Sequence, residues 1–244
     1  MKTEHSSTPP IILAIETATK ACSAALAIGG KIITRFSIAP REHTKLILNM
    51  MDEVLEEANI KLNQVDAIAF SRGPGAFTGV RIAVGVAHGI ALSTDKLLLP
   101  ISTLAAIAQQ MQQQQNAQYC LAALDARMGE VYWGKYRVKK GLMTLQGTEA
   151  VSKPEYLLTA LKTDNQKTVW TLAGSGWDEY APQLDLETNQ KFIKINNILP
   201  SAESIAKLAI EDWKQGKAVN IEEAQPIYLR DKVAQTVAER KVAI

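Results

Sequence analysis

Short apolar runs bounded by turn residues open the chain, and helical spacing follows them. Three runs lie close together at residues 11–16, 22–28 and 31–38, and Gly29-Gly30 separates the last two. Runs of this length favour strands, and a glycine pair favours a tight hairpin turn. We therefore expect antiparallel hairpins at the start of the fold.

Apolar residues recur every three or four positions between residues 43 and 58, which predicts an amphipathic helix with one broad buried face. The same patterns predict four further elements in this half of the chain: a strand at 65–70, a helix at 78–92, a strand at 97–101 and a helix that Ser102 caps. The predicted order in this half is therefore β-β-β-α-β-α-β-α.

The second half of the chain repeats this order. Its predicted elements are strands at 119–124, 130–138 and 142–151, a helix capped by Ser152, a strand at 169–173, a short helix, a strand at 192–195, and a helix at 201–215 that ends at Gly216. We predict an α/β protein with two lobes, residues 11–115 and 116–216, each a β-β-β-α-β-α-β-α unit. A disordered start at 1–10 and an irregular tail at 217–244 complete the chain.

Composition is that of an ordinary globular protein, and the charge narrows the choice of partners. Of the 244 residues, 47% are apolar and 21% are charged, and the net charge is only +2. A charge this balanced argues against binding nucleic acid by charge alone, so any RNA contact has to be local or made by a partner. Cys22 and Cys120 lie in apolar runs, and we expect both to be buried, reduced thiols.

The first ten residues are polar and lack the basic segment and apolar stretch of a secretory signal. No apolar run approaches the roughly 18 residues that a membrane span needs. We therefore expect a cytoplasmic protein without a membrane partner.

The helix predicted at 78–92 is apolar on more than one side, so it needs cover on nearly all sides. Gly85 and Gly89 share a face that a second helix could approach closely, and the helix at 43–58 carries a wide apolar band. We predict that the two helices form half of a four-helix interface with another polypeptide; the alternative is that both are core helices. The predicted interface residues are Leu46, Ile47, Met50, Met51, Val54, Val80, Ile82, Val84, Gly85, His88 and Gly89.

Two consequences follow from this predicted interface. A charge placed at Met50 or Val84 is expected to break the interface and to leave the isolated fold intact. Because the exposed face would otherwise stay in water, we also expect the chain to form a homodimer through the same helices when it is alone.

The loop from Gly73 to Arg81 is the most glycine-rich segment of the chain. A glycine-rich turn from a strand into a helix is suited to binding an anion, because free backbone N–H groups and the helix dipole converge there. The loop lacks the lysine that follows the last glycine of a Walker loop. The favoured alternative is a tight turn whose glycines permit close packing.

Acidic residues follow the first strand of each lobe, Glu16 in one and Asp125 in the other. An acid and neighbouring hydroxyls at such places can hold Mg²⁺ and phosphate between two lobes. The alternative for each acid is a turn that accepts hydrogen bonds from nearby backbone N–H groups. The candidate remnant of a nucleotide site comprises Glu16, Thr17, Asp125, Arg127, Gly174 and Gly176.

The histidines do not form a metal-binding pair. His43 is followed one helical turn later by Ile47, His5 lies in the predicted disordered start, and His88 fits a helix contact better than a metal site. The segment Gly174-Ser175-Gly176 lacks the spacing of a serine hydrolase. We therefore predict no metal ligands and no catalytic residues.

Two lobes with this element order, and an acidic turn after each first strand, resemble the superfamily of acetate kinase, sugar kinases, heat-shock chaperone ATPases and actin, known as the ASKHA fold. Five segments resemble the bacterial TsaB (YeaZ) family more closely, and the likeness extends over nearly the whole chain. These segments are IETAT at 15–19, REHT at 41–44, SRGPGAFTGVR at 71–81, LDAR at 124–127 and PIYLR at 226–230. The block at 71–81 is the most specific.

The resemblance implies a two-lobed ASKHA fold and a non-catalytic partner of TsaD, its active paralogue, and of the ATPase TsaE. The assembly adds a threonylcarbamoyl group to the adenosine next to the tRNA anticodon. The resemblance also implies that the two helices form a bundle with TsaD, and that Ile47 stands where TsaD has a second metal-binding histidine. It implies no tightly bound cofactor, because the complex would use ATP through the partners. It also implies that tRNA is bound by the complex as a whole.

The sequence departs from the superfamily at two positions. Glu16 stands where an aspartate is usual, and Arg127 stands where a small residue is usual. Both departures weaken a nucleotide-binding interpretation. One alternative function is an ATP-dependent phosphotransferase or ATPase that uses Glu16 and Asp125. Another is a metal-dependent peptidase, which no residue of the sequence supports.

Overall fold

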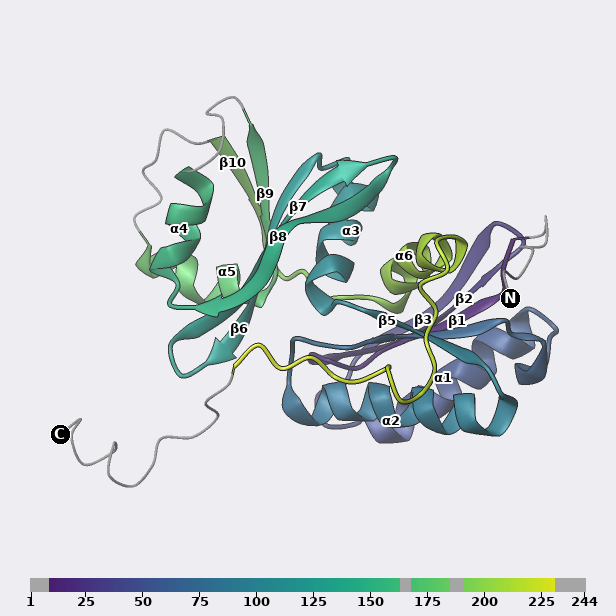
Figure 1. The fold of residues 1–244 in the computed structure, drawn as a ribbon. Helices are drawn as coiled ribbons and strands as arrows, with labels where there is room; N and C mark the ends of the chain where they lie inside the picture. The colour runs from purple at the N-terminus through teal and green to yellow at the C-terminus, as the bar shows by residue number, and fades with distance from the viewer. Residues whose placement is uncertain (1–8, 163–167, 185–190, 231–244) are drawn as a thin grey trace, which may run out of the picture.

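A computed structural model describes residues 9–162, 168–184 and 191–230, which form two five-stranded mixed sheets with helices on both sides of each (Figure 1). The elements follow the predicted order in both halves of the chain, so the predicted two-lobed α/β fold is confirmed. The predicted disordered start lies outside the described residues except for Pro9 and Pro10, as do His5 and the part of the tail beyond residue 230.

The first sheet is built from the N-terminal half of the chain. Its strands are β1 (Ile12–Glu16), β2 (Ala21–Ile28), β3 (Lys31–Ile38), β4 (Ala67–Ser71) and β5 (Leu97–Ile101), in the spatial order β3-β2-β1-β4-β5. The predicted hairpins pair β1, β2 and β3 antiparallel, whereas β4 and β5 run parallel to β1. The carboxyl ends of β1 and β4, Glu16 and Ser71, therefore lie side by side at one edge of the sheet.

The second sheet repeats this arrangement. Its strands are β6 (Tyr119–Arg127), β7 (Glu130–Lys139), β8 (Leu142–Ser152), β9 (Val169–Ala173) and β10 (Lys191–Ile195), in the spatial order β10-β9-β6-β7-β8. Strand β6 occupies the place of β1, and its pairing with β7 shifts register between Asp125 and Arg127. The turn that carries Asp125 thus corresponds to the turn that carries Glu16.

Helices cover the outer face of each sheet, the face directed away from the other sheet (Figure 1). On the first sheet these are α1 (His43–Glu57) and α2 (Phe77–Thr94), and on the second they are α4 (Glu155–Lys162) and α5 (Ser175–Tyr180). Two 3₁₀ turns that the sequence patterns did not predict follow α1 and α5, at Leu62–Gln64 and Ala181–Gln183. Trp177 anchors α5, because its indole is fully buried and donates a 2.9 Å hydrogen bond to the Leu121 carbonyl.

The two remaining helices lie between the sheets and are exchanged between the halves of the chain. Helix α3 (Thr103–Gln115), which closes the first half, packs mainly on the second sheet, and α6 (Ala202–Lys214), which closes the second half, packs on the first sheet. They meet where the Ser204 hydroxyl donates to the Gln113 amide oxygen at 3.0 Å. The lobe boundaries 11–115 and 116–216 stay a prediction; in the structure each of these two helices packs mainly on the sheet built by the other half of the chain.

The predicted ends of the helices are partly confirmed. The Ser102 hydroxyl accepts hydrogen bonds from the N–H groups of Leu104 and Ala105, so Ser102 caps α3. Gly216 follows α6 with a φ of +69°, the conformation that favours glycine at this position. The prediction that Ser152 caps α4 was wrong, because Ser152 belongs to β8 and its hydroxyl accepts from the Trp133 indole N–H.

Helix α2 corrects the expectation that no segment is long and apolar enough for a membrane span. By length and composition alone its 18 residues meet that requirement, at a mean hydropathy of 1.2. The helix packs along the first sheet, however, with Val80, Ala83, Ala87 and Ala91 in the core. Burial on the first sheet therefore explains the apolar residues on one side of α2, whereas Leu92 on the other side is 80% exposed.

The described part of the tail joins the two lobes. Val219 forms an antiparallel bridge with Leu98 of β5, and the Ile227 N–H donates to the Arg72 carbonyl at 2.8 Å. Two residues beyond Tyr228, Arg230 forms an ion pair with Glu130 and donates to the Arg127 carbonyl at 3.2 Å. Residues 226–230 thus run from the glycine-rich loop of the first lobe to the β6–β7 turn of the second (Figure 1).

Candidate functional site

Helices α1 and α2 lie on the side of the first sheet that faces away from the second lobe (Figure 1). More than half of the predicted interface residues are buried beneath the two helices and do not lie on the exposed surface of α1 and α2. These residues pack into the core against the first sheet: Ile47, Met50, Met51 and Val54 of α1, and Val80 and Val84 of α2. For these six positions the alternative of core helices holds, because they serve the core of the chain itself.

Three of the other predicted residues, together with Leu92, form an apolar stripe along the outside of α2. We define the outer helix surface by Ile82, Gly85, Gly89 and Leu92; Leu46 is partly buried against the core. Leu92 is 80% exposed, and a Cβ added at Gly85 or Gly89 would meet nothing within 4 Å. The surface is thus apolar and low enough along the glycines for another helix to approach closely. Leu92 was not among the predicted interface residues, although it is the most exposed large apolar side chain of α2.

The burial of Met50 and Val84 changes the expected effect of a charge at these positions. The two side chains are only 9% and 8% exposed, and both belong to the core beneath the helices. A charge there would be buried without a partner and would unfold the chain itself. The expectation that the isolated fold survives is therefore wrong, and a test of the interface has to use the outer helix surface.

The glycine-rich loop is a packing device. A Cβ at Gly75 would lie under 3.0 Å from the Ala18 carbonyl, and one at Gly79 equally close to the Thr17 carbonyl. The Ala76 N–H donates to the Ala18 carbonyl at 2.7 Å, and the Thr17 hydroxyl donates to the Gly79 carbonyl at 2.7 Å. The turn after β1 therefore occupies the start of α2, where an anion would otherwise be held. The interpretation as a tight turn is the one that fits.

Glu16 is fully buried next to this contact. One carboxyl oxygen accepts from the Ala18 N–H, while the other has no hydrogen-bond partner among the described residues. Burial raises the pKa of Glu16 to about 7, although the Ala18 N–H and the neighbouring Ser71 side chain lower it in part. Burial, together with the nearby Glu16 charge, also raises the pKa of the Cys22 thiol to about 11. Cys22 and Cys120 are both buried free thiols, as predicted.

Asp125 has a different environment. One carboxyl oxygen accepts from the Arg127 N–H at 2.8 Å and from the Tyr180 hydroxyl at 3.1 Å, and the other pairs with the Arg127 guanidinium at 3.1 Å. Gly174 and Gly176 pack directly against Ala123 of β6, as Gly75 and Gly79 pack against the turn after β1. The two acidic turns are thus equivalent in the fold, but one acid is buried alone and the other is neutralised by an arginine of its own turn.

The described histidines make contacts within the chain. The Nε2 atom of His43 lies within hydrogen-bond distance of the carbonyls of Thr19 and Ala21, and that of His88 lies 2.8 Å from the Ala224 carbonyl. His88, predicted as an interface residue, is therefore directed toward the tail. Among residues 9–162, 168–184 and 191–230 no group of three or more His, Cys, Asp or Glu side chains is placed to hold a metal ion.

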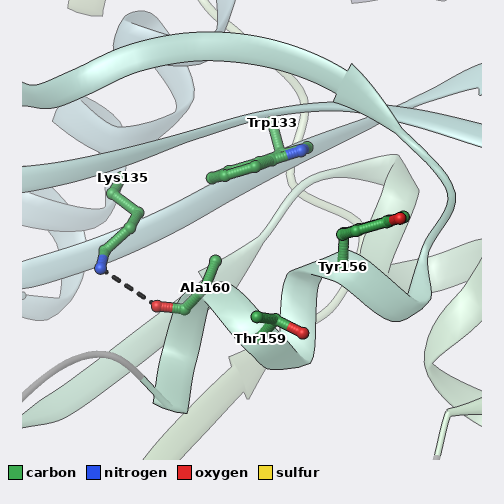
Figure 2. A pocket seen from close by; sticks show the side chains of 5 residues that line it. All are labelled: Trp133, Lys135, Tyr156, Thr159 and Ala160. Atoms are coloured by element: carbon green, nitrogen blue, oxygen red, sulfur yellow. Dashed lines mark hydrogen bonds between the residues drawn. The ribbon is translucent and has the colours of Figure 1, made fainter.

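A shallow pocket lies on the outer side of the second sheet, between β7 and α4. Figure 2 shows its lining, which consists of Trp133, Lys135, Tyr156, Thr159 and Ala160. The Lys135 ammonium donates to the Ala160 carbonyl at 3.0 Å and lies 5.1 Å from the centre of the Trp170 ring. The pocket contains none of the predicted site residues, and its one charged group is held by the protein.

The chain is similar to known proteins over most of its length. The family model for TsaD, tRNA N6-adenosine threonylcarbamoyltransferase, matches residues 36–237. The chain is 41% identical over 224 residues to the tRNA threonylcarbamoyladenosine biosynthesis protein TsaB of Escherichia coli (strain K12). The matched residues cover 91% of this chain and 96% of that protein. The solved structure of YeaZ from Pseudomonas aeruginosa is 41% identical, covers 90% of this chain and 100% of that one, and gives a TM-score of 0.83.

The similarity to the transferase itself is more limited. The tRNA N6-adenosine threonylcarbamoyltransferase of Prosthecochloris aestuarii (strain DSM 271 / SK 413) is 33% identical over 110 residues, which cover 39% of this chain and 32% of that protein. The similarity to TsaB proteins therefore spans both lobes, whereas this match to the transferase is confined to part of each chain.

Proposed function

Because this chain belongs to the TsaB (YeaZ) family, we propose that it takes part in the biosynthesis of threonylcarbamoyladenosine in tRNA as a non-catalytic partner subunit of a TsaD transferase. The observation that carries the proposal is the outer helix surface. It is apolar, and it contains two glycines one helical turn apart, Gly85 and Gly89, with open space above them. No other described segment of the chain covers it. Such a surface fits the packing of two further helices against α1 and α2.

The contacts within the candidate nucleotide site support a subunit that does no chemistry alone. The start of α2 is filled by the turn after β1, and Asp125 is paired with Arg127. His43 is engaged with two backbone carbonyls. In this proposal the chain binds no cofactor tightly, and the complex uses ATP through its partners, which include the ATPase TsaE. The complex as a whole reaches tRNA in the cytoplasm, and free chains pair through the same helices.

The test places a leucine in the open space above α2. In the variant Gly85→Leu we expect TsaD to bind about 5- to 150-fold more weakly, because overpacking a close helix contact costs about 1–3 kcal/mol. The chain itself should fold as well as the wild type, since a Cβ at this position meets nothing and leucine favours helix over glycine. Calorimetric titration with TsaD measures the affinity, and light scattering shows whether free chains still pair.

The matched control is Gln114→Leu, which adds a leucine at an exposed position of α3, away from the outer helix surface. This variant should bind TsaD as the wild type does. Wild-type affinity of Gly85→Leu for TsaD would show that the partner does not pack on α2, and the proposed interface would have to be abandoned.

A further inference from the structure

An aromatic and basic cluster stands where the tail crosses the start of α2. The guanidinium of Arg81 lies 3.6 Å from the centre of the Phe77 ring, and its Nε donates to the Tyr228 hydroxyl at 3.0 Å. The rings of Phe77 and Tyr228 are 5.9 Å apart. Although Phe77 and Tyr228 lie far apart in the chain, the tail brings the two rings to one place on the surface.

These side chains remain open to solvent. Phe77 is 51% exposed and Tyr228 is 46% exposed. Within the described part of the chain, Arg81 makes no ion pair, and its only hydrogen bond uses Nε. A contact that served only to fix the tail would gain more by burying the two rings. The ring faces that Arg81 does not cover, and the Arg81 N–H groups that make no hydrogen bond among the described residues, are thus available to a ligand.

A second arginine extends the cluster toward the second lobe. Arg230, two residues beyond Tyr228, donates to the carbonyl of Arg127, and the Arg127 side chain is 88% exposed. Its partner Asp125 is only 14% exposed, so the guanidinium faces outward over a mostly buried acid. We call Phe77, Arg81 and Tyr228, with Arg127 linked to them through Arg230, the aromatic–arginine surface.

We infer that the aromatic–arginine surface binds an unpaired segment of RNA, with bases stacked on Tyr228 and Phe77 and phosphates held by Arg81 and Arg127. This inference rests on the proposed function, and it makes the chain itself a contact for the tRNA. Aromatic rings next to arginines are the chemistry that binds single strands, because every base offers a ring face and every nucleotide a phosphate.

The distribution of charge favours RNA at this place. The net charge of +2 is too small to attract RNA to the chain as a whole, so a contact has to be local. The exposed side of α1 carries Asp52 and Glu56, which repel phosphates. Arg81, in the first turns of α2, instead presents a cation that makes no ion pair within the described residues.

The test measures the binding of a fluorescein-labelled stem-loop RNA with an unpaired loop, by fluorescence anisotropy, to the full chain alone and to its complex with TsaD. Tyr228→Leu should weaken binding about tenfold, since losing a stacked base costs that much. Arg81→Gln should weaken binding as well, because it removes a charged contact to a phosphate. Arg81→Gln should also reduce the slope of log affinity against log salt by about one. Tyr228→Phe keeps the ring and should stay close to the wild type.

Lys139→Gln is the charge-matched control, because it also removes one positive charge. Lys139 ends β7, whereas Glu130, which pairs with Arg230 of the tail, begins it. It should bind RNA as the wild type does. Binding of every variant to TsaD is measured in parallel, and circular dichroism confirms that each is folded.

Two results would overturn the inference. Unchanged RNA affinity of Tyr228→Leu and Arg81→Gln would do so and leave the proposed subunit role standing. Loss of TsaD binding by the same variants would do so too, since the surface would then be a protein contact. If the wild type itself failed to bind TsaD, the proposed function would fall, and RNA binding by the chain alone would decide the inference.

Discussion

Replacing Gly79 with alanine is expected to destabilise the fold by about 3 kcal/mol or more, or to prevent folding altogether. A Cβ at this position would lie under 3.0 Å from the Thr17 carbonyl, and the obstacle is backbone that cannot rotate away. The Thr17 hydroxyl also donates to the Gly79 carbonyl at 2.7 Å, so any shift of the helix breaks a buried hydrogen bond. Urea unfolding followed by circular dichroism measures the loss.

The same helix supplies the control. Gly85→Ala also adds one methyl group to α2, but nothing lies within 4 Å of it, so the variant should gain about 0.5–1 kcal/mol from helix propensity. The two substitutions on one helix thus have opposite signs. Equal stability of Gly79→Ala and the wild type would mean that the turn after β1 does not press on the start of α2, and the glycine-rich loop would then not be a packing device.

The order of elements could be predicted because it depends on local patterns. Period-two and helical spacing, together with turn residues such as Gly29-Gly30 and caps such as Ser102, are set by neighbours in sequence. The exchange of α3 and α6 could not be predicted in this way. An amphipathic helix shows that one of its faces is buried, as Ile107 of α3 and Ile205 of α6 do, but not which sheet covers it.

The candidate sites were predicted less well, for a related reason. The apolar residues of α1 and α2 suggested an interface, yet most of them face inward, and the outer surface depends on Gly85 and Gly89, which carry almost no hydrophobic signal. The two acidic turns were found in equivalent places. Their difference in charge depends on Arg127 beside Asp125 and on the burial of Glu16, and burial cannot be read from the sequence around Glu16.

The burial of Glu16 makes the stability of the protein depend on pH. Its pKa rises from 4.5 to about 7 on folding, so the folded chain keeps a proton that the unfolded chain releases. The stabilisation from this proton is fully present below pH 4.5 and is lost as the pH rises toward 7. Glu16 is fully buried, so its carboxyl is not accessible to a Mg²⁺–phosphate ligand in this structure, which argues against the alternative function as a phosphotransferase.

Glu16→Gln is therefore expected to stabilise the protein by roughly 3 kcal/mol at about pH 8, relative to the wild type, and to change its stability little at about pH 4.5. Glutamine can still accept from the Ala18 N–H, and its amide has no charge to desolvate at the position of the unpartnered carboxyl oxygen. Urea unfolding of both proteins across this pH range measures the difference. Glu56→Gln, at an exposed position of α1, is the control and should follow the wild type at every pH. Parallel curves for Glu16→Gln and the wild type would show that the Glu16 carboxylate is solvated or paired in solution, and the acidic turn of the first lobe would regain its place as a candidate ligand site.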